Sequence, residues 1–183
     1  LSGKGGEAAP NVLVLSATPI PRTLSLVLFG DLDVSIVNEL PAGRKPVKTR
    51  IVPEEKRAGM YGFIRAQAAA GRQSYIICPL VAESEALECK SAEETYAELK
   101  RGALSSLRLG LVHGKMKAAK KDETLRRFAA GELDALVSTT VVEVGVDVPN
   151  ATVMAIENAD RFGLSQLHQL RGRVGRGSEE SWC

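Results

Sequence analysis

Short apolar runs alternate with longer segments of helical periodicity along most of this 183-residue chain, and this alternation restricts the fold more than any other feature. The runs have strand length and are rich in β-branched residues, as in SYIIC at 74–78, which is typical of a strand buried on both faces. The segments between them are long enough for crossover helices. This order predicts an α/β fold in which helices sandwich a parallel sheet.

The expected elements alternate in kind along the chain. Strands are predicted at 11–16, 33–37, 47–52, 74–78, 107–112, 134–139 and 151–157. Helices are predicted at 22–29, 54–70, 91–101 and 117–130, and a further helix begins at 165. Gly71 and Gly131 are expected to end two of these helices, while Ser91 and Glu94 form a predicted capping box at the start of a third.

A segment rich in proline and glycine, NELPAGRKP at 38–46, marks a predicted domain boundary. We therefore expect a part of one domain at 1–42 and a second domain at 43–183. No apolar run reaches the roughly 18 residues of a membrane span, and the first ten residues lack the apolar core of a signal peptide. The three widely spaced cysteines argue against a zinc site or a disulfide framework and fit a reducing cytoplasm.

In open α/β sheets, ligands bind beyond the carboxyl ends of the strands, so the segments that follow predicted strands are the first place to seek a site. The most unusual segment is QLRGRVGRG at 169–177, which interleaves three arginines and three glycines. Glycine lets the backbone approach a ligand closely, and the guanidinium fork of arginine suits phosphate oxygens. The pattern indicates a phosphate site, with a solvated basic turn as the alternative.

Three further segments hold polar residues where predicted strands end. STTVVEVGVDVP at 138–149 places hydroxyls after a strand and an aspartate in the following loop, which favours contacts to a backbone phosphate or a ribose. HGKMK at 113–117 opens a basic helix, which favours phosphate binding. SATPIPRT at 16–23 joins a buried strand to a helix through two prolines. Each segment alone is compatible with an ordinary turn, so their joint occurrence carries the argument.

Taken in their order along the chain, the four segments resemble the C-terminal motor motifs of superfamily 2 helicases. SATPIPRT is similar to motif III, HGKM to motif IVa, STTVVEVGVDVP to motif V and QLRGRVGRG to motif VI. The string TPIPRTL looks like both RecG-type branch-migration helicases and transcription-repair coupling translocases. GDLDVS together with ELPAGRKP looks more like the RecG type, so the coupling translocases remain the alternative. The resemblance covers nearly the whole chain and implies a RecA-like fold of the kind found in helicase C-terminal domains.

On the nucleotide side, the resemblance implies that Arg173 and Arg176 reach ATP phosphates across a cleft between two lobes, with Gln169 as the motif VI glutamine. Gly145 and Asp147 match motif V positions near the nucleotide. We therefore expect the two arginines to share a sheet edge with the loop around Asp147. ATP with Mg²⁺ is the implied cofactor, bound mainly by the other lobe, and no metal ligand is predicted in this chain.

On the nucleic-acid side, the resemblance implies contacts to the DNA backbone from His113, Gly114, Lys115, Thr139 and Thr140. Coupling between the nucleotide site and the neighbouring lobe is implied for Ser16, Ala17 and Thr18. The implied partners are branched or forked DNA and an N-terminal motor lobe.

The chain has neither a G-x-x-x-x-G-K-[ST] phosphate loop nor an acidic DExH box. Because these motifs hold the phosphates and the magnesium ion, the chain is predicted to be an excised part of a longer helicase and not to hydrolyse ATP alone. A non-catalytic nucleic-acid-binding module is the alternative from another functional class, since residues 113–127 carry six basic and two acidic side chains. A stand-alone nucleotide-binding domain lacks support, because no glycine loop follows the first strand.

Overall fold

A computed structural model describes residues 35, 44–79, 85–139 and 148–183. The elements predicted at 11–16 and 22–29 lie outside these residues, as does all but one residue of the strand predicted at 33–37. The predicted domain boundary after residue 42 also lies outside them. The organisation of the first 43 residues therefore stays a prediction.

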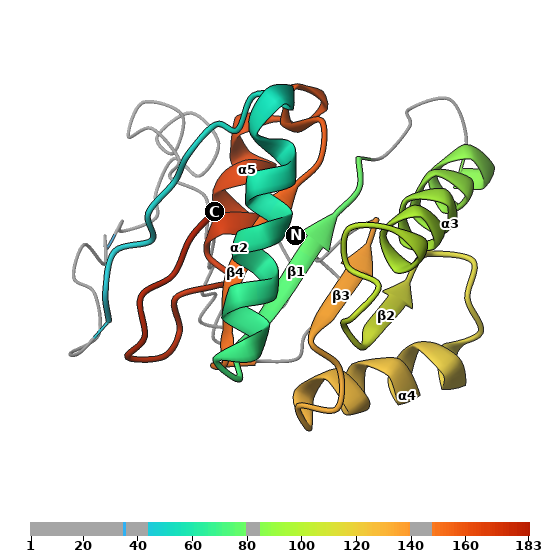
Figure 1. Cartoon of the computed structure of the whole chain (residues 1–183). Helices are drawn as coiled ribbons and strands as arrows, with labels where there is room; N and C mark the ends of the chain where they lie inside the picture. Colours follow the sequence, from blue (N-terminus) through green and yellow to red (C-terminus); the bar gives the residue numbers. More distant parts are fainter. Residues whose placement is uncertain (1–34, 36–43, 80–84, 140–147) are drawn as a thin grey trace, which may run out of the picture. The chain divides into compact units, whose positions relative to one another are not determined.

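Four parallel strands form the sheet of the described region (Figure 1). They are β1 (Gln73–Ile77), β2 (Leu109–Val112), β3 (Ala135–Ser138) and β4 (Ala151–Ile156). Their lateral order is β2-β3-β1-β4, so β2 and β4 are the outer strands of this set. Each begins and ends within two residues of the predicted bounds, and the predicted parallel sheet is confirmed.

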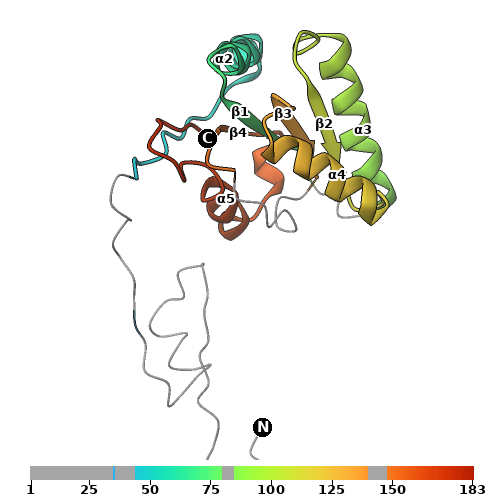
Figure 2. The same ribbon diagram turned by 90° about the horizontal axis from the view of Figure 1, so that it is seen from below.

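Helices cover both faces of the sheet (Figure 2). A short 3-10 helix, η1 (Glu54–Lys56), leads into α2 (Arg57–Ala69), which lies with α3 (Glu85–Arg101) on one face. The opposite face carries α4 (Ala118–Ala129) and α5 (Leu164–Arg171). Among the described helices, none combines the length and the apolar character that crossing a membrane requires.

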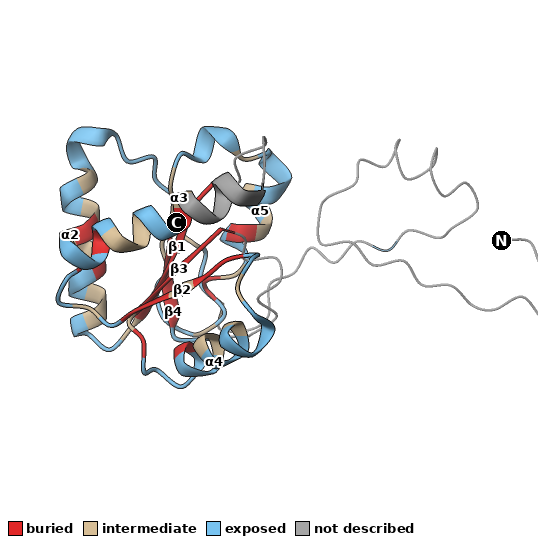
Figure 3. Cartoon of the chain, turned by 90° about the vertical axis from the view of Figure 1, so that its right-hand side faces the viewer, coloured by how far each residue is buried: buried red, intermediate tan, exposed pale blue. Residues whose placement is uncertain are grey.

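The side chains of β1 divide between two apolar clusters, one on each face. Tyr75 and Ile77 pack toward α4 and α5, while Ile76 belongs to the cluster under α2 and α3 together with Cys78, the residue that follows the strand. All four are at most 2% exposed, and Figure 3 shows the strands as the buried layer between helices with exposed outer surfaces. Burying a side chain of this size stabilises the fold by about 1.5–3 kcal/mol, so these residues make β1 the centre of the core.

The predicted helix ends are partly confirmed. Gly71 and Gly131 follow α2 and α4 with φ of 76° and 75°, a conformation that glycine adopts without steric cost. The predicted capping box at Ser91 is wrong, because α3 begins at Glu85 and Ser91 lies well inside the helix. The residues that precede Ser91 include glutamate, alanine and leucine, which favour helix and extend it toward the N-terminus.

The strand predicted at 47–52 is replaced by a single parallel bridge that joins Lys48 to Trp182. Trp182 also bridges to Val153 in β4, so the C-terminal edge segment (181–183) lies between β4 and the linker segment (44–50). Backbone N–H groups of Lys48 and Arg50 donate to carbonyls of this edge segment, each at 2.8 Å.

Candidate functional site

Two segments predicted to contact DNA leave the carboxyl edge of the sheet side by side. Val112 of β2 pairs with Ser138 of β3, and the next residues along each strand are His113 and Thr139. Both side chains are buried, with exposed fractions of 8% and 3%. The structure thus brings together residues that are 26 positions apart in the sequence, as a site shared by motifs IVa and V requires.

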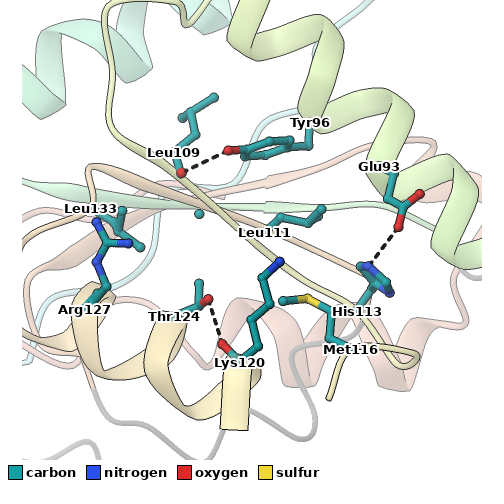
Figure 4. Close-up of a pocket in the computed structure, with 11 residues that line it drawn as sticks. Glu93, Tyr96, Leu109, Leu111, His113, Met116, Lys120, Thr124, Arg127 and Leu133 are labelled. Carbon is teal, nitrogen blue, oxygen red and sulfur yellow. Dashed lines mark hydrogen bonds and ion pairs between the residues drawn. The ribbon is translucent and has the colours of Figure 1, made fainter. Parts of the chain in front are cut away.

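His113 is held by a contact with α3 (Figure 4). Its Nε2 lies 3.2 Å from the Oε1 atom of Glu93, which sequence reasoning did not single out. This contact orients the imidazole ring toward α3. Nδ1 is buried and has no hydrogen-bond partner among the described residues. The buried ring therefore braces the loop, while Gly114 and Lys115 are the exposed residues that face solvent.

The amino end of α4 completes this edge. Lys117 is the N-cap residue of this helix, and its side chain makes no capping hydrogen bond. Amide N–H groups of the first helical turn are therefore available to a ligand. Lys115 and Lys117 are both exposed. Open amides, a helix dipole and nearby lysines together favour an anion such as a phosphate.

The predicted arginines follow α5, which leads the chain away from the carboxyl end of β4. Leu170 and Val174 are buried in the cluster beneath α5 and fix the turn between them. Gln169 and Arg173 are half-buried, and Arg176 is exposed. The Nε atom of Arg176 donates to the carbonyl oxygen of Gly172 at 3.4 Å, which orders the arginine loop (172–177) internally.

The arginine loop packs beside the amino end of β4. An ideal Cβ placed on Gly177 would lie 3.0 Å from the carbonyl oxygen of Pro149, and one placed on Gly175 would lie 2.9 Å from a methyl carbon of Val47. Pro149 stands two residues before β4 begins. The expectation that the candidate segments all lie beyond the carboxyl ends of strands is therefore wrong for this loop, because α5 carries the chain back along the sheet.

The described candidate residues thus form two groups on different parts of the sheet. One group follows β2 and β3 at the carboxyl edge, while the other packs against the start of β4, the outer strand on the opposite side. Strands lie about 4.8 Å apart, so three intervals place β2 and β4 about 14 Å from each other. The two groups therefore lie at separate places on the sheet.

The loop that leads from β4 into α5 is fixed by a polar network. Glu157 follows β4 directly and accepts a hydrogen bond from the Tyr61 hydroxyl at 2.8 Å, and it pairs with Arg57 at 2.6 Å. Burial, followed by the negative charge of Glu157, raises the pKa of Tyr61 to about 12. The network thus joins the end of β4 to α2.

Several predicted site residues lie outside the described residues, namely Ser16, Ala17, Thr18, Thr140, Gly145 and Asp147. The proximity of the two arginines to Asp147 consequently stays a prediction, although Pro149, two residues further on, contacts the arginine loop. Sequence reasoning also missed Arg44, whose side chain reaches the arginine loop. Its position in a string rich in proline and glycine indicated only a linker.

Comparison with known proteins identifies the family. Residues 55–178 match the Helicase conserved C-terminal domain family. The chain belongs to this family. The match includes the described parts of motifs IVa, V and VI, so the two groups of candidate residues lie in a helicase C-terminal domain.

The most similar relatives include several RecG proteins. The ATP-dependent DNA helicase RecG of Synechocystis is 55% identical over 175 residues, which cover 96% of this chain and 21% of that protein. RecG of Bacillus subtilis is 50% identical over 183 residues, covering 100% of this chain and 26% of that protein. The predicted resemblance to RecG-type helicases is confirmed, and the chain spans about a quarter of the length of these curated relatives.

Solved structures agree with the predicted RecA-like fold. A structure of RecG bound to a three-way DNA junction matches with a TM-score of 0.74 and 49% identity, covering 91% of this chain and 21% of that one. S. cerevisiae Dbp5 bound to RNA and ADP BeF3 matches with a TM-score of 0.53 at 18% identity, over 76% of this chain and 34% of that one. The second likeness shows the fold alone.

Proposed function

We propose that this helicase C-terminal domain is the second motor lobe of an ATP-dependent DNA helicase of RecG type that remodels branched DNA. The observation that carries the proposal is the separation of the two groups of candidate residues. A motor must hold a nucleotide and a nucleic-acid backbone at the same time, and two groups of residues at separate places on one sheet suit that task. The similarity to RecG proteins over nearly the whole chain supports the same conclusion.

On the nucleotide side, Arg173 and Arg176 bind and orient the phosphates of ATP held by a preceding lobe. Their guanidinium groups stabilise the negative charge that develops on the transferring phosphoryl group. Gln169 lies at the end of α5 next to this loop. Within the described ranges, no group of three or more His, Cys, Asp or Glu side chains is arranged to hold a metal ion. The guanidinium groups suit phosphate and not a cation, so we assign Mg²⁺ to the preceding lobe together with the phosphate loop.

On the DNA side, the exposed amides and lysines at the start of α4 bind backbone phosphates. The buried residues His113 and Thr139, at the ends of β2 and β3, position the loops that carry these groups. Contacts of this kind carry no base information, so binding does not depend on sequence and weakens with salt. RecG in the matching structure is bound to a three-way DNA junction. We extend branched DNA to this chain as the substrate class on the strength of 49% identity to that protein.

The nucleotide assignment is tested in the two-lobed protein that carries this chain. Arg173→Ala and Arg176→Ala should each reduce DNA-stimulated ATP turnover on the order of 10³-fold, because an arginine delivered to the γ-phosphate supplies that much rate. DNA affinity should stay within about twofold of the wild-type value, since the loop lies away from the DNA group. Arg161→Ala, an exposed arginine outside the loop, is the matched control. Wild-type turnover in both loop variants would refute the assignment.

The DNA assignment has its own test. Lys115→Ala should lower the affinity for forked DNA and reduce the slope of log K against log salt concentration by about 0.9, as expected when one phosphate contact is lost. Its nucleotide-dependent turnover at saturating DNA should be retained. The isolated 183-residue chain is expected to bind DNA weakly. Strong binding by the chain alone, with turnover of the two-lobed protein unaffected by Arg173→Ala, would favour a non-catalytic binding module.

A further inference from the structure

Arg44 reaches across the domain to the backbone of the arginine loop. Its Nε atom donates a hydrogen bond to the carbonyl oxygen of Gly175 at 2.9 Å, although the two residues are 131 positions apart. The Arg44 side chain is half-buried, so the bond is partly shielded from water. A hydrogen bond from a charged donor is about twice as strong as one between neutral groups.

Gly175 is the residue of the loop that most needs such a restraint. It stands between Arg173 and Arg176 with φ of 73°. Because glycine has no Cβ atom, its backbone can leave this conformation for others at little steric cost. Rotation of the peptide group of Gly175 would redirect the chain into Arg176. Fixing its carbonyl oxygen therefore fixes the direction in which the following arginine leaves the backbone.

The linker segment that carries Arg44 is itself held by hydrogen bonds and an ion pair to the C-terminal residues. Backbone hydrogen bonds join Lys48 to Ser181 at 2.8 Å and Arg50 to Cys183 at 2.8 Å. The Lys48 ammonium group pairs with Glu180 at 2.8 Å. A Val47 methyl carbon lies against Gly175, where it would be only 2.9 Å from an added Cβ.

We infer that Arg44 is a positioning residue for the arginine loop, and that the linker segment sets the orientation of Arg176 and Arg173. The linker segment directly follows the predicted boundary at residue 42, so it is the first part of this domain that a movement of the preceding domain reaches. Through Arg44, such a movement acts on the loop without passing through the sheet. The consequence for catalysis rests on the proposed function, whereas the restraint on the loop does not.

The restraint is tested on the 183-residue chain without any nucleotide. In Arg44→Ala and Arg44→Met, amide hydrogen exchange of a peptide covering residues 172–177 should become about tenfold faster, as expected when one restraining hydrogen bond of about 1.4 kcal/mol is lost. Methionine keeps most of the side-chain bulk and removes the donor. Arg50→Ala is the control, because it removes the same charge from the same segment and keeps the backbone bond to Cys183. Unchanged exchange in both Arg44 variants overturns the inference.

The catalytic consequence is tested in the two-lobed protein. Arg44→Met should lower kcat for ATP about tenfold or more while KM for DNA is unchanged, because small misplacements of a catalytic group cost up to about a hundredfold. Arg50→Ala should leave kcat unchanged. Faster loop exchange with wild-type kcat overturns the catalytic part of the inference if Arg173→Ala is inactive. If Arg173→Ala is also fully active, the proposed function fails, and the restraint stands on the exchange data.

Discussion

Replacing Gly175 with alanine tests the packing of the linker segment on the arginine loop. Alanine at φ of 73° carries a cost of about 1–2 kcal/mol relative to glycine. Its Cβ atom would also lie 2.9 Å from a Val47 methyl carbon, and overpacking of this kind costs about 1–3 kcal/mol. We expect Gly175→Ala to lower the free energy of unfolding by about 2–5 kcal/mol, a large part of the about 5–15 kcal/mol of a typical domain.

Urea unfolding of the 183-residue chain measures this loss, followed by circular dichroism and by the fluorescence of Trp182, the single tryptophan. Trp182 is a suitable reporter because its ring packs edge-on against Phe63 with centroids 5.0 Å apart, next to the linker segment. Coincident transitions by the two probes would establish that unfolding is two-state. The midpoint should fall without a change in the m-value, since the same surface is exposed on unfolding.

Two further variants separate the steric cost from the conformational cost. Val47→Ala removes the methyl group that an added Cβ meets, so the double variant with Gly175→Ala should be more stable than the sum of the single effects by about 1–3 kcal/mol. Gly59→Ala in α2 is the control, because nothing lies within 4 Å of its added Cβ and alanine favours helix by about 0.5–1 kcal/mol. Strict additivity, or a Gly175→Ala loss below about 0.5 kcal/mol, would refute the reasoning.

Three other predictions concern the core. Gln73→Leu removes two buried hydrogen bonds, at 2.6 and 2.8 Å, that join β1 to the end of α4 and the start of β3, so urea unfolding should show a loss of about 2 kcal/mol. Cys78 is fully buried and burial raises its pKa to about 11, so in the native chain at pH 8 mass spectrometry should find Cys78 unmodified by iodoacetamide until urea is added. Tyr61 ionises near pH 10 in the unfolded chain and near pH 12 in the folded one. The free energy of unfolding that Tyr61 contributes is therefore fully present below pH 10 and is lost between pH 10 and 12. An equally steep loss of stability over this range in Tyr61→Phe would contradict the prediction.

The sequence was sufficient to predict the layers of the fold and most element bounds, because apolar periodicity is a local signal. The buried run at 74–78 is an example, since its alternate side chains fill both apolar clusters of the domain. The predicted start of α3 was wrong because Ser91 and Glu94 match a capping-box pattern, whereas the residues before Ser91 favour helix and extend it to Glu85. The strand expected at 47–52 depends on a partner at 181–183, which periodicity within either segment cannot reveal.

The candidate site was predictable in its residue types and less so in its arrangement. Motif resemblance selected His113, Arg173 and Arg176, but it did not indicate that His113 is buried against Glu93. Strand order determines which loops converge, and α5 turns the arginine loop away from the carboxyl edge. The role of Arg44 depends on a contact with Gly175, 131 positions away, and a single sequence carries no signal for such a contact.

The pairing of the linker segment with the C-terminal edge segment also has a consequence for folding order. The Lys48–Glu180 ion pair closes a separation of 132 residues, and the entropy lost on closing such a loop must be recovered by contacts made first elsewhere. Long-range contacts of this type form slowly compared with local helices. We therefore expect the pairing of the two segments, and the arginine loop packed against them, to form after the sheet during folding.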